Sequence, residues 1–292
     1  MLALIGTIPY PNLPVISREI LIKDGNLTIG GESFPIHRGF QAMIGAAAIV
    51  CAELGLSSPI GFTVGDIGLG DGSRRLYEYL KNRLTDLPAK VLTFHYLMPD
   101  VNWHNKVFWA IEERAERPIL IADAGFMYVA KMSGYAPSYD LFTPDIGELA
   151  FLADDMAPHP FYTRGFICHE ESNVPSLISR AYQGENASKA MIVKGEKDYI
   201  CSKGEIVAII EEPNVEALEA IGGTGDTLTG IVSALIYGGY AIEEAAILAA
   251  RINRIAGQLA HPNPGTQVSE IIRHIPKAIS MALKKNILTV SK

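Results

Sequence analysis

The amino-acid sequence predicts an α/β protein with a mostly parallel central sheet and helices on both faces. Two observations support this fold class. Short apolar runs alternate with longer segments of helical periodicity along most of the chain, as in proteins whose parallel strands are joined by crossover helices. In addition, residues 118–123 form an uninterrupted apolar run that ends in a carboxylate, which is typical of a parallel strand covered on both faces.

The first half of the chain is expected to contain five strands and three helices. The first three expected strands are short apolar runs broken by Gly and Asn. Residues 42–54 carry small and apolar side chains on every face, which predicts a buried helix. Residues 73–84 have an amphipathic pattern, and 105–116 are expected to be a helix with Trp109 and Ile111 facing inward. The strands are expected at residues 2–5, 20–22, 27–29, 60–64 and 91–94.

The second half begins with the run 118–123, and residues 141–143 repeat its design before a helix at 147–153. Three short strands joined by Gly-containing turns follow, which predicts an antiparallel addition to the sheet. Ligands of such sheets bind outside the carboxyl ends of the strands, so functional residues are expected in the loops there. The remaining strands are expected at 190–193, 199–201 and 206–210, and the remaining helices at 227–237, 242–260 and 268–283.

Composition limits the classes of protein to consider. The chain has 292 residues, of which 48% are hydrophobic and 20% charged, which suits a packed core and excludes a disordered chain. The net charge of −7 opposes nonspecific binding to nucleic acid or to an anionic membrane. No apolar run approaches the ~20 residues of a membrane helix. The three cysteines are scattered, as reduced cytosolic thiols are, so a cytoplasmic location is expected.

No linker, charge block or internal repeat divides the chain, and a single domain over residues 1–292 is expected.

The most informative segment runs from Gly222 to Asp226 and leads directly into a helix. Glycines at a helix start allow the backbone to approach a ligand, and the free amides there attract phosphate or a developing anionic oxygen. Asp226 has two interpretations. It either satisfies amides of the first helical turn or accepts the proton of a hydroxyl that attacks a phosphoryl group.

The segment Gly-Gly-Thr-Gly-Asp-Thr-Leu-Thr-Gly (222–230) resembles the anion-hole signature of the ribokinase-like superfamily. It is most similar to the version in ATP- or ADP-dependent NAD(P)H-hydrate dehydratases. Three other segments agree with this resemblance in the family's order, and together they cover about residues 118–260. These are Leu-Phe-Thr-Pro-Asp-Ile-Gly-Glu (141–148), Ile-Val-Lys-Gly (192–195) and the strand ending in Asp-Ala (119–124). The usual His-Pro of the dehydratases is replaced by Asp145 and Ile146.

The resemblance implies a three-layer ribokinase-like fold, ATP or ADP as the nucleotide, and Mg²⁺. It implies Asp226 as the catalytic base. The other implied site residues are the anion hole of Gly223, Thr224 and Gly225; the nucleotide-binding Lys194, Gly195, Gly222 and Asn253; the substrate-binding Asp123 and Asp145; and Glu148, which holds the metal through water.

Several of these residues also have structural interpretations. Asp145 and Glu148 have the spacing of a capping pair at a helix start. Lys194 could equally be an exposed lysine at a strand end, Asn253 a buried structural amide, and Asp123 the cap of the following helix.

Two further groups were weighed. The turn His37-Arg38-Gly39 is better explained as a solvated basic turn than as a contact for an anionic substrate. His95, Trp103, His104 and Trp109 have no spacing that matches a metal site.

The function expected is phosphorylation of a hydroxyl on a small molecule. The first hypothesis is a nucleotide-dependent NAD(P)H-hydrate dehydratase, in which loss of the phosphate restores the nicotinamide. The second is a sugar or vitamin kinase on the same scaffold, and the third is a nucleotide-binding protein without activity. Relatives in the superfamily often form oligomers, so the resemblance leaves a homo-oligomer open.

Overall fold

The computed structural model describes residues 1–23, 25–157 and 173–290, with side chains up to Lys284. Backbone contacts divide the chain into two compact units that are interleaved along the sequence. Unit 1 consists of Met1–Ser17 and Phe62–Ile209, and unit 2 of Arg18–Gly61 and Ile210–Lys292. The single domain expected over residues 1–292 stays a prediction. Cys168 lies outside the described residues.

Unit 1 is built on a sheet whose middle strands are parallel. Its strand order is β11-β10-β9-β8-β7-β6-β1-β5. The pairs β1–β6, β6–β7, β7–β8 and β8–β9 are parallel, and β10 joins β9 antiparallel, as predicted. The strands are β1 (Leu2–Ile8), β5 (Ile60–Gly65), β6 (Val91–Phe94), β7 (Ile119–Ala122), β8 (Leu141–Phe142), β9 (Ala190–Val193), β10 (Asp198–Ser202) and β11 (Glu205–Ile210).

The interior strands of this sheet are fully apolar, and this explains their parallel pairing. Every residue of β1, β6 and β9 is buried, so none alternates between core and solvent. The predicted class, an α/β chain with a large sheet that is parallel in its middle, is confirmed.

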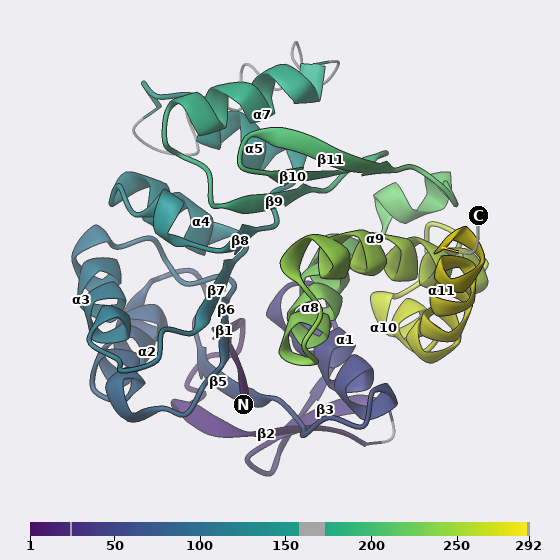
Figure 1. The fold of residues 1–292 in the computed structure, drawn as a ribbon. Coiled ribbons are helices and arrows are strands. Elements are labelled where there is room, and N and C mark those ends of the chain that lie inside the picture. Colours follow the sequence, from purple (N-terminus) through teal and green to yellow (C-terminus); the bar gives the residue numbers. More distant parts are fainter. Residues whose placement is uncertain (24, 158–172, 291–292) are drawn as a thin grey trace. The chain divides into compact units, whose positions relative to one another are not determined.

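In the described part of unit 1, five α-helices connect the strands, and α2, α3 and α4 lie side by side along the sheet (Figure 1). Side chains fix several of their starts. Asp100 caps α3 by accepting a hydrogen bond from the Trp103 amide at 3.0 Å. The helices are α2 (Asp71–Lys81), α3 (Val101–Glu112), α4 (Gly125–Met132), α5 (Ile146–Leu152) and α7 (Val174–Gln183).

Unit 2 contains a small antiparallel sheet of β2 (Ile16–Lys23), β3 (Asn26–Ile29) and β4 (Glu32–Pro35). The β3–β4 hairpin turns on Gly30 and Gly31, both with positive φ (61° and 90°). A two-residue hairpin loop of type I′ has positive φ at both positions, which glycine adopts without strain. Ile20, Leu27 and Phe34 bury their side chains in this sheet.

Five α-helices lie in the part of unit 2 that the structure describes, and α1 packs closely along α8. A Cβ on Gly230 of α8 would collide with the Met43 carbonyl oxygen of α1, so glycine is needed for this approach. Helix α8 also packs on α9, and α9 on α11. The helices are α1 (Phe40–Glu53), α8 (Thr224–Tyr237), α9 (Ile242–Leu259), α10 (Val268–Ile272) and α11 (Ile275–Val290).

Two expectations of the sequence analysis are wrong. Trp109 does not face inward but is 53% exposed, whereas Ile111 is buried as expected. The predicted last helix at 268–283 is two helices, α10 and α11, separated at Arg273–His274. Pro276 in the first turn of α11 has no amide hydrogen to donate to the carbonyl of Ile272, the last residue of α10, so α10 does not continue into α11.

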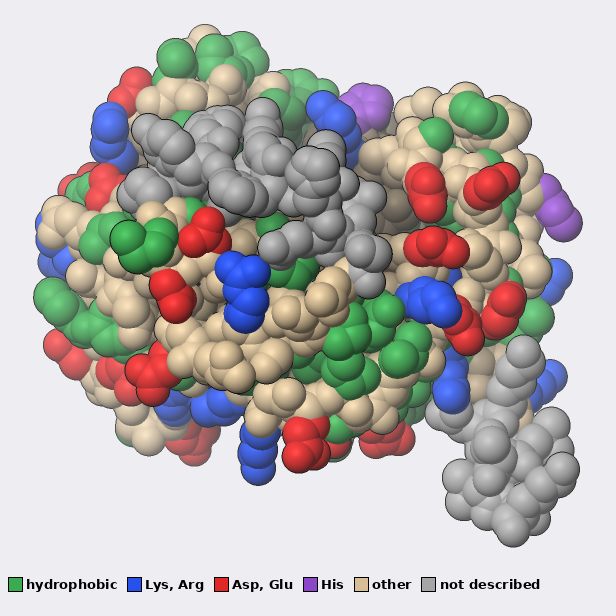
Figure 2. Space-filling model, turned by 90° about the horizontal axis from the view of Figure 1, so that it is seen from above, with side chains coloured by type: hydrophobic (Ala, Val, Ile, Leu, Met, Phe, Trp, Pro, Cys, Tyr) green, Lys and Arg blue, Asp and Glu red, His purple; other side chains and the backbone are tan. Residues whose placement is uncertain are grey.

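Cys51 in unit 2 and Cys201 in unit 1 are both buried free thiols. On the face of the molecule seen in Figure 2, acidic and basic side chains are interspersed. Among the helices that the structure describes, none is long and apolar enough to cross a membrane.

Candidate active site

The glycine-rich turn at the start of α8 leaves its first amides without a side-chain cap. Gly223 is the N-cap residue, with φ of 107°, and has no side chain that could accept a hydrogen bond from the first turn. A helix start of this kind presents N–H groups and the positive end of the helix dipole. The turn is therefore suited to bind an anionic oxygen.

The glycines of this turn leave space for the neighbouring residue Arg38 and not only for a ligand. A Cβ on Gly222 would lie 3.0 Å from Cδ of Arg38, and a Cβ on Gly223 would lie 3.1 Å from the Arg38 Cα. Gly223 also needs glycine for its left-handed backbone. The sequence analysis attributed these glycines to the approach of a ligand, and the structure adds the close passage of Arg38.

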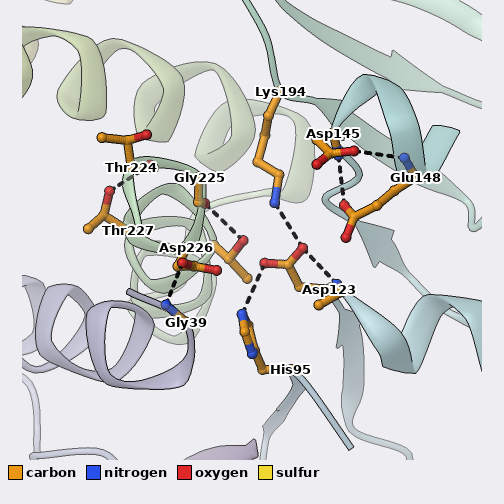
Figure 3. Close-up of polar contacts among 12 residues, drawn as sticks. Gly39, His95, Asp123, Asp145, Glu148, Lys194, Thr224, Gly225, Asp226 and Thr227 are labelled. Atoms are coloured by element: carbon orange, nitrogen blue, oxygen red, sulfur yellow. Dashed lines mark hydrogen bonds and ion pairs between the residues drawn. The ribbon is translucent and has the colours of Figure 1, made fainter. Parts of the chain in front are cut away.

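Asp226 lies in the first turn of α8 and is half-buried. Its Oδ2 atom accepts a hydrogen bond from the Gly39 amide at 2.7 Å (Figure 3). Gly39 is the N-cap residue of α1, so the carboxylate joins the starts of two helices of unit 2. This contact fixes the carboxylate beside the uncapped amides, where a general base for a reacting hydroxyl is needed.

Asn253 of α9 and Thr227 of α8 hold the first residue of α8. Asn253 Nδ2 donates to the Thr224 carbonyl oxygen at 2.9 Å. The Thr227 Oγ1 atom lies 2.7 Å from the same carbonyl oxygen and 2.6 Å from Asn253 Oδ1. Both polar ends of the Asn253 amide thus contact the start of α8.

Arg38 is an exposed residue whose aliphatic chain lies against Gly222. This contact places the aliphatic part of a basic side chain beside the segment that leads into α8. The sequence analysis favoured a solvated basic turn at 37–39. Sequence reasoning missed that the turn at 37–39 lies against the glycine segment 222–226, because the two are more than 180 positions apart along the chain.

In unit 1, three charged or titratable side chains each follow a strand in the parallel part of the sheet. His95 comes directly after β6, Asp123 after β7 and Lys194 after β9. Asp123 is 1% exposed, and its Oδ1 atom accepts a hydrogen bond from Lys194 Nζ at 2.8 Å (Figure 3). Its Oδ2 atom lies 3.8 Å from His95 Nε2, and the Ala124 amide donates to Oδ1 at 2.9 Å.

In this cluster Asp123 contacts Lys194 and His95. His95 is a residue that sequence reasoning missed. His95 was grouped with His104 and two tryptophans, whereas the structure places it beside Asp123. His104 instead contacts the Tyr139 hydroxyl at 2.9 Å. The signal for His95 was its position directly after a buried strand, which is the argument that singled out Asp123.

Asp145 and Glu148 form a capping box at the start of α5. The Asp145 amide donates to Glu148 Oε2 at 2.8 Å, and the Glu148 amide donates to Asp145 Oδ1 at 2.7 Å. The capping geometry is thus present. Desolvation, together with the negative charge of Asp145, raises the pKa of the Glu148 carboxyl well above its ordinary value.

The end of β9 lies against this box. The Lys194 amide donates to the Pro144 carbonyl at 2.8 Å, and Asp145 and Lys194 form a parallel β-bridge. A Cβ on Gly195 would lie 3.2 Å from Ile146 Cδ1, so a small residue is favoured there. The sequence-predicted residues therefore form two groups, Asp123, Asp145, Glu148, Lys194 and Gly195 in unit 1, and Gly222–Asp226 with Asn253 in unit 2.

The fold defines the class of protein. The structure is similar to a ribokinase-like superfamily protein from Enterococcus faecalis V583, with a TM-score of 0.58, 18% identity and coverage of 82% of each chain. It is also similar to the ADP/ATP-dependent NAD(P)H-hydrate dehydratase from Bacillus subtilis co-crystallized with ATP/Mg²⁺. There the TM-score is 0.54, with 14% identity over 82% of this chain and 84% of the other. The fold is that of the ribokinase-like superfamily.

Sequence comparison then gives the family. The carbohydrate-kinase family described as NAD(P)H-hydrate dehydratase matches residues 98–277, and the chain belongs to this family. An uncharacterized protein of Methanocaldococcus jannaschii is 48% identical over 223 residues, which are 76% of this chain and 91% of that protein.

The ADP-dependent (S)-NAD(P)H-hydrate dehydratase of Haloterrigena turkmenica is 35% identical over 97 residues, 32% of this chain and 37% of that enzyme. Family and fold together place the chain in the NAD(P)H-hydrate dehydratase family, on a ribokinase-like fold.

Proposed function

We propose that the protein is an ADP- or ATP-dependent NAD(P)H-hydrate dehydratase. The observation that carries this proposal is the carboxylate of Asp226, which the Gly39 amide holds beside the uncapped start of α8 in a chain of this family. The similar enzymes from Haloterrigena turkmenica and Bacillus subtilis, whose names give this activity, support it.

In this reaction Asp226 accepts the proton of the substrate hydroxyl while the hydroxyl oxygen forms a bond to the terminal phosphorus of the nucleotide. The bond from that phosphorus to the bridging oxygen breaks, and the shortened nucleotide leaves with the electron pair. The amides of Gly223, Thr224 and Gly225 stabilise the negative charge on the transferred group. The C–O bond of the phosphorylated hydrate then breaks, phosphate leaves, and loss of a proton from the adjacent carbon restores the nicotinamide double bond.

Arg38 supports the same role for the start of α8. A guanidinium binds phosphate oxygens in a planar, bidentate manner. The aliphatic part of the Arg38 side chain lies against Gly222, in the same turn as the amides that we assign to the anion hole, and we therefore assign its guanidinium to the phosphate oxygens.

In unit 1 we assign Lys194 and Gly195 to the nucleotide, Asp123 and Asp145 to the substrate and Glu148 to Mg²⁺ through water. The residues fit the metal, because the carboxylates of Asp145 and Glu148 lie together in the capping box at the start of α5, and carboxylate oxygens are ligands that Mg²⁺ prefers. When bound, Mg²⁺ neutralises the phosphate charge. Asp123 holds the Lys194 ammonium in place through the 2.8 Å ion pair.

The second candidate is a sugar or vitamin kinase. The family match begins at residue 98, so β2, β3, β4 and the Arg38 turn lie outside it. Elements outside the matched region are where a different acceptor would be recognised. In both candidates a hydroxyl is phosphorylated by the same base and anion hole.

The test combines the wild-type protein with Asp226→Asn. Wild-type protein with hydrated NADH, Mg²⁺ and either ATP or ADP is expected to regenerate NADH. Asp226→Asn is expected to lower kcat by about 10²–10⁴-fold, because a general base contributes that much, while calorimetry shows nucleotide binding retained.

The matched control is Asp71→Asn, since Asp71 also lies in the first turn of a helix whose N-cap glycine is left-handed. It is expected to keep full activity. Undiminished turnover in Asp226→Asn would refute the assignment of the base. Phosphorylation of a sugar or of pyridoxal without recovery of NADH would select the kinase.

A further inference from the structure

The start of α8 has no side-chain N-cap, and the Asp226 carboxylate of its first turn accepts a hydrogen bond from the Gly39 amide, at the start of α1. The N-cap of α8 is Gly223, and its second residue is Gly225, which favours the unfolded chain by roughly 0.5–1 kcal/mol relative to alanine. A side chain at the N-cap would satisfy the first amides but would also occupy them. An anion hole needs the opposite arrangement, a rigid first turn whose amides stay open.

Asn253 and Thr227 hold the first turn of α8 through the carbonyl oxygen of Thr224. The Thr224 carbonyl oxygen accepts a hydrogen bond from Asn253 Nδ2 at 2.9 Å and lies 2.7 Å from Thr227 Oγ1. Thr227 is fully buried, and its 2.6 Å contact with Asn253 Oδ1 closes the network. The two side chains therefore contact each other as well as the carbonyl oxygen.

The peptide group transmits this constraint to the anion hole. The carbonyl of Thr224 and the amide of Gly225 belong to one planar peptide unit, in which the C=O and N–H bonds point in opposite directions. Fixing the carbonyl oxygen against α9 therefore fixes the direction of the Gly225 N–H. That amide points away from Asn253, toward the open end of the helix.

We infer that Asn253 and Thr227 are positioning residues that aim the Gly225 amide at the transferred phosphate, an inference that rests on the proposed function. They replace the missing N-cap without occupying the amides. Asn253 acts through the backbone of α8, and this differs from the nucleotide contact that the family resemblance implies for it.

Kinetics of Thr227→Val test this inference, because valine has the shape of threonine but no hydroxyl. We expect kcat to fall about tenfold, which corresponds to the loss of one well-placed hydrogen bond, and the nucleotide Kd to change less than about threefold. Thr227→Ser keeps the hydroxyl and is expected to restore kcat. Asn253→Leu is expected to resemble Thr227→Val.

The matched control is Ser233→Ala, which removes another buried hydroxyl of α8, one that donates to the Thr229 carbonyl at 2.7 Å. It is expected to lower stability as Thr227→Val does but to leave kcat unchanged. Equal losses of kcat in the two variants, or a loss of nucleotide affinity as large as the loss of kcat in Thr227→Val, would overturn the inference.

A second measurement separates this inference from the proposed function. Inorganic phosphate is titrated into ¹⁵N-labelled protein, and the Gly225 amide shift is followed by NMR. The shift is expected in the wild type and in Ser233→Ala, and to need at least about fivefold more phosphate in Thr227→Val. If the wild-type protein regenerates no NADH, the proposed function fails, and the titration alone decides. The positioning role is contradicted if phosphate does not shift the Gly225 amide in the wild type, or if Thr227→Val needs no more phosphate than the wild type for the same shift.

Discussion

At the scale of single residues, His104 illustrates how burial controls charge. Its side chain is fully buried, Nε2 lies 2.9 Å from the Tyr139 hydroxyl, and the rings of Phe108 and Phe126 are nearby. Desolvation lowers the pKa of His104 to about 4. The imidazole is therefore neutral in the folded protein at pH 7.

This histidine makes the protein sensitive to acid. Between pH 6.5 and about 4 the unfolded chain binds a proton at His104 and the folded chain does not, so stability falls as the pH falls through this window. The contribution is about 3 kcal/mol between pH 7 and pH 4. Urea denaturation over this range measures it. The variant His104→Gln is expected to have a shallower dependence, and an unchanged slope would contradict the assignment.

Single residues also show what the sequence could reveal. Asp226 and Asp123 were predictable because a glycine run or a buried strand comes directly before each. The hydrogen bond between Asp226 and Gly39 was not, since it joins distant segments. Trp109 was misplaced because the buried face of α3 follows His104, Val107 and Phe108. The indole Nε1 atom of Trp109 donates to the Tyr135 hydroxyl at 3.2 Å.

At the scale of elements, the contact between α1 and α8 depends on Gly230. Replacing a helical glycine by alanine ordinarily stabilises a helix by about 1 kcal/mol. At Gly230 the added methyl group would meet the Met43 carbonyl oxygen, which belongs to backbone and cannot rotate away. Gly230→Ala is therefore expected to destabilise the protein by about 1–3 kcal/mol.

Thermal and chemical denaturation measure this effect. Gly45→Ala in α1 serves as the control, because its Cβ would lie 3.4 Å from Ile36 Cδ1, an ordinary contact. It is expected to be neutral or stabilising. A neutral Gly230→Ala would show that the two helices tolerate a wider separation.

The elements themselves were largely predictable, and their failures have local causes. The strands predicted at 91–94 and 190–193 match the structure, because short continuous apolar runs are typical of buried strands. Helix α4 was missed because its eight residues are too few to show a recognisable helical periodicity. The break before α11 was missed because the apolar pattern continues through it. Predicting the break would have required giving Pro276 more weight than that pattern.

At the scale of the whole molecule, the sequence predicted the α/β class but not its division into interleaved units. Strand and helix alternation is a local signal and predicts the parallel sheet. The assignment of Arg18–Gly61 and Ile210–Lys292 to one unit depends on contacts between remote parts of the chain, such as α1 with α8. No local pattern carries that information. The groups assigned to the reaction are likewise distributed between the two units.

The buried cysteines turn this division into a measurable property. Burial raises the pKa of both Cys51 and Cys201 to about 12, so alkylating reagents reach reactive thiolate only after local or global opening. One thiol lies in each unit. In a Cys168→Ser background, equal labelling rates of the two cysteines across a denaturant series are expected if residues 1–292 unfold as a single cooperative domain. Earlier modification of one thiol would reveal which half of the molecule opens first.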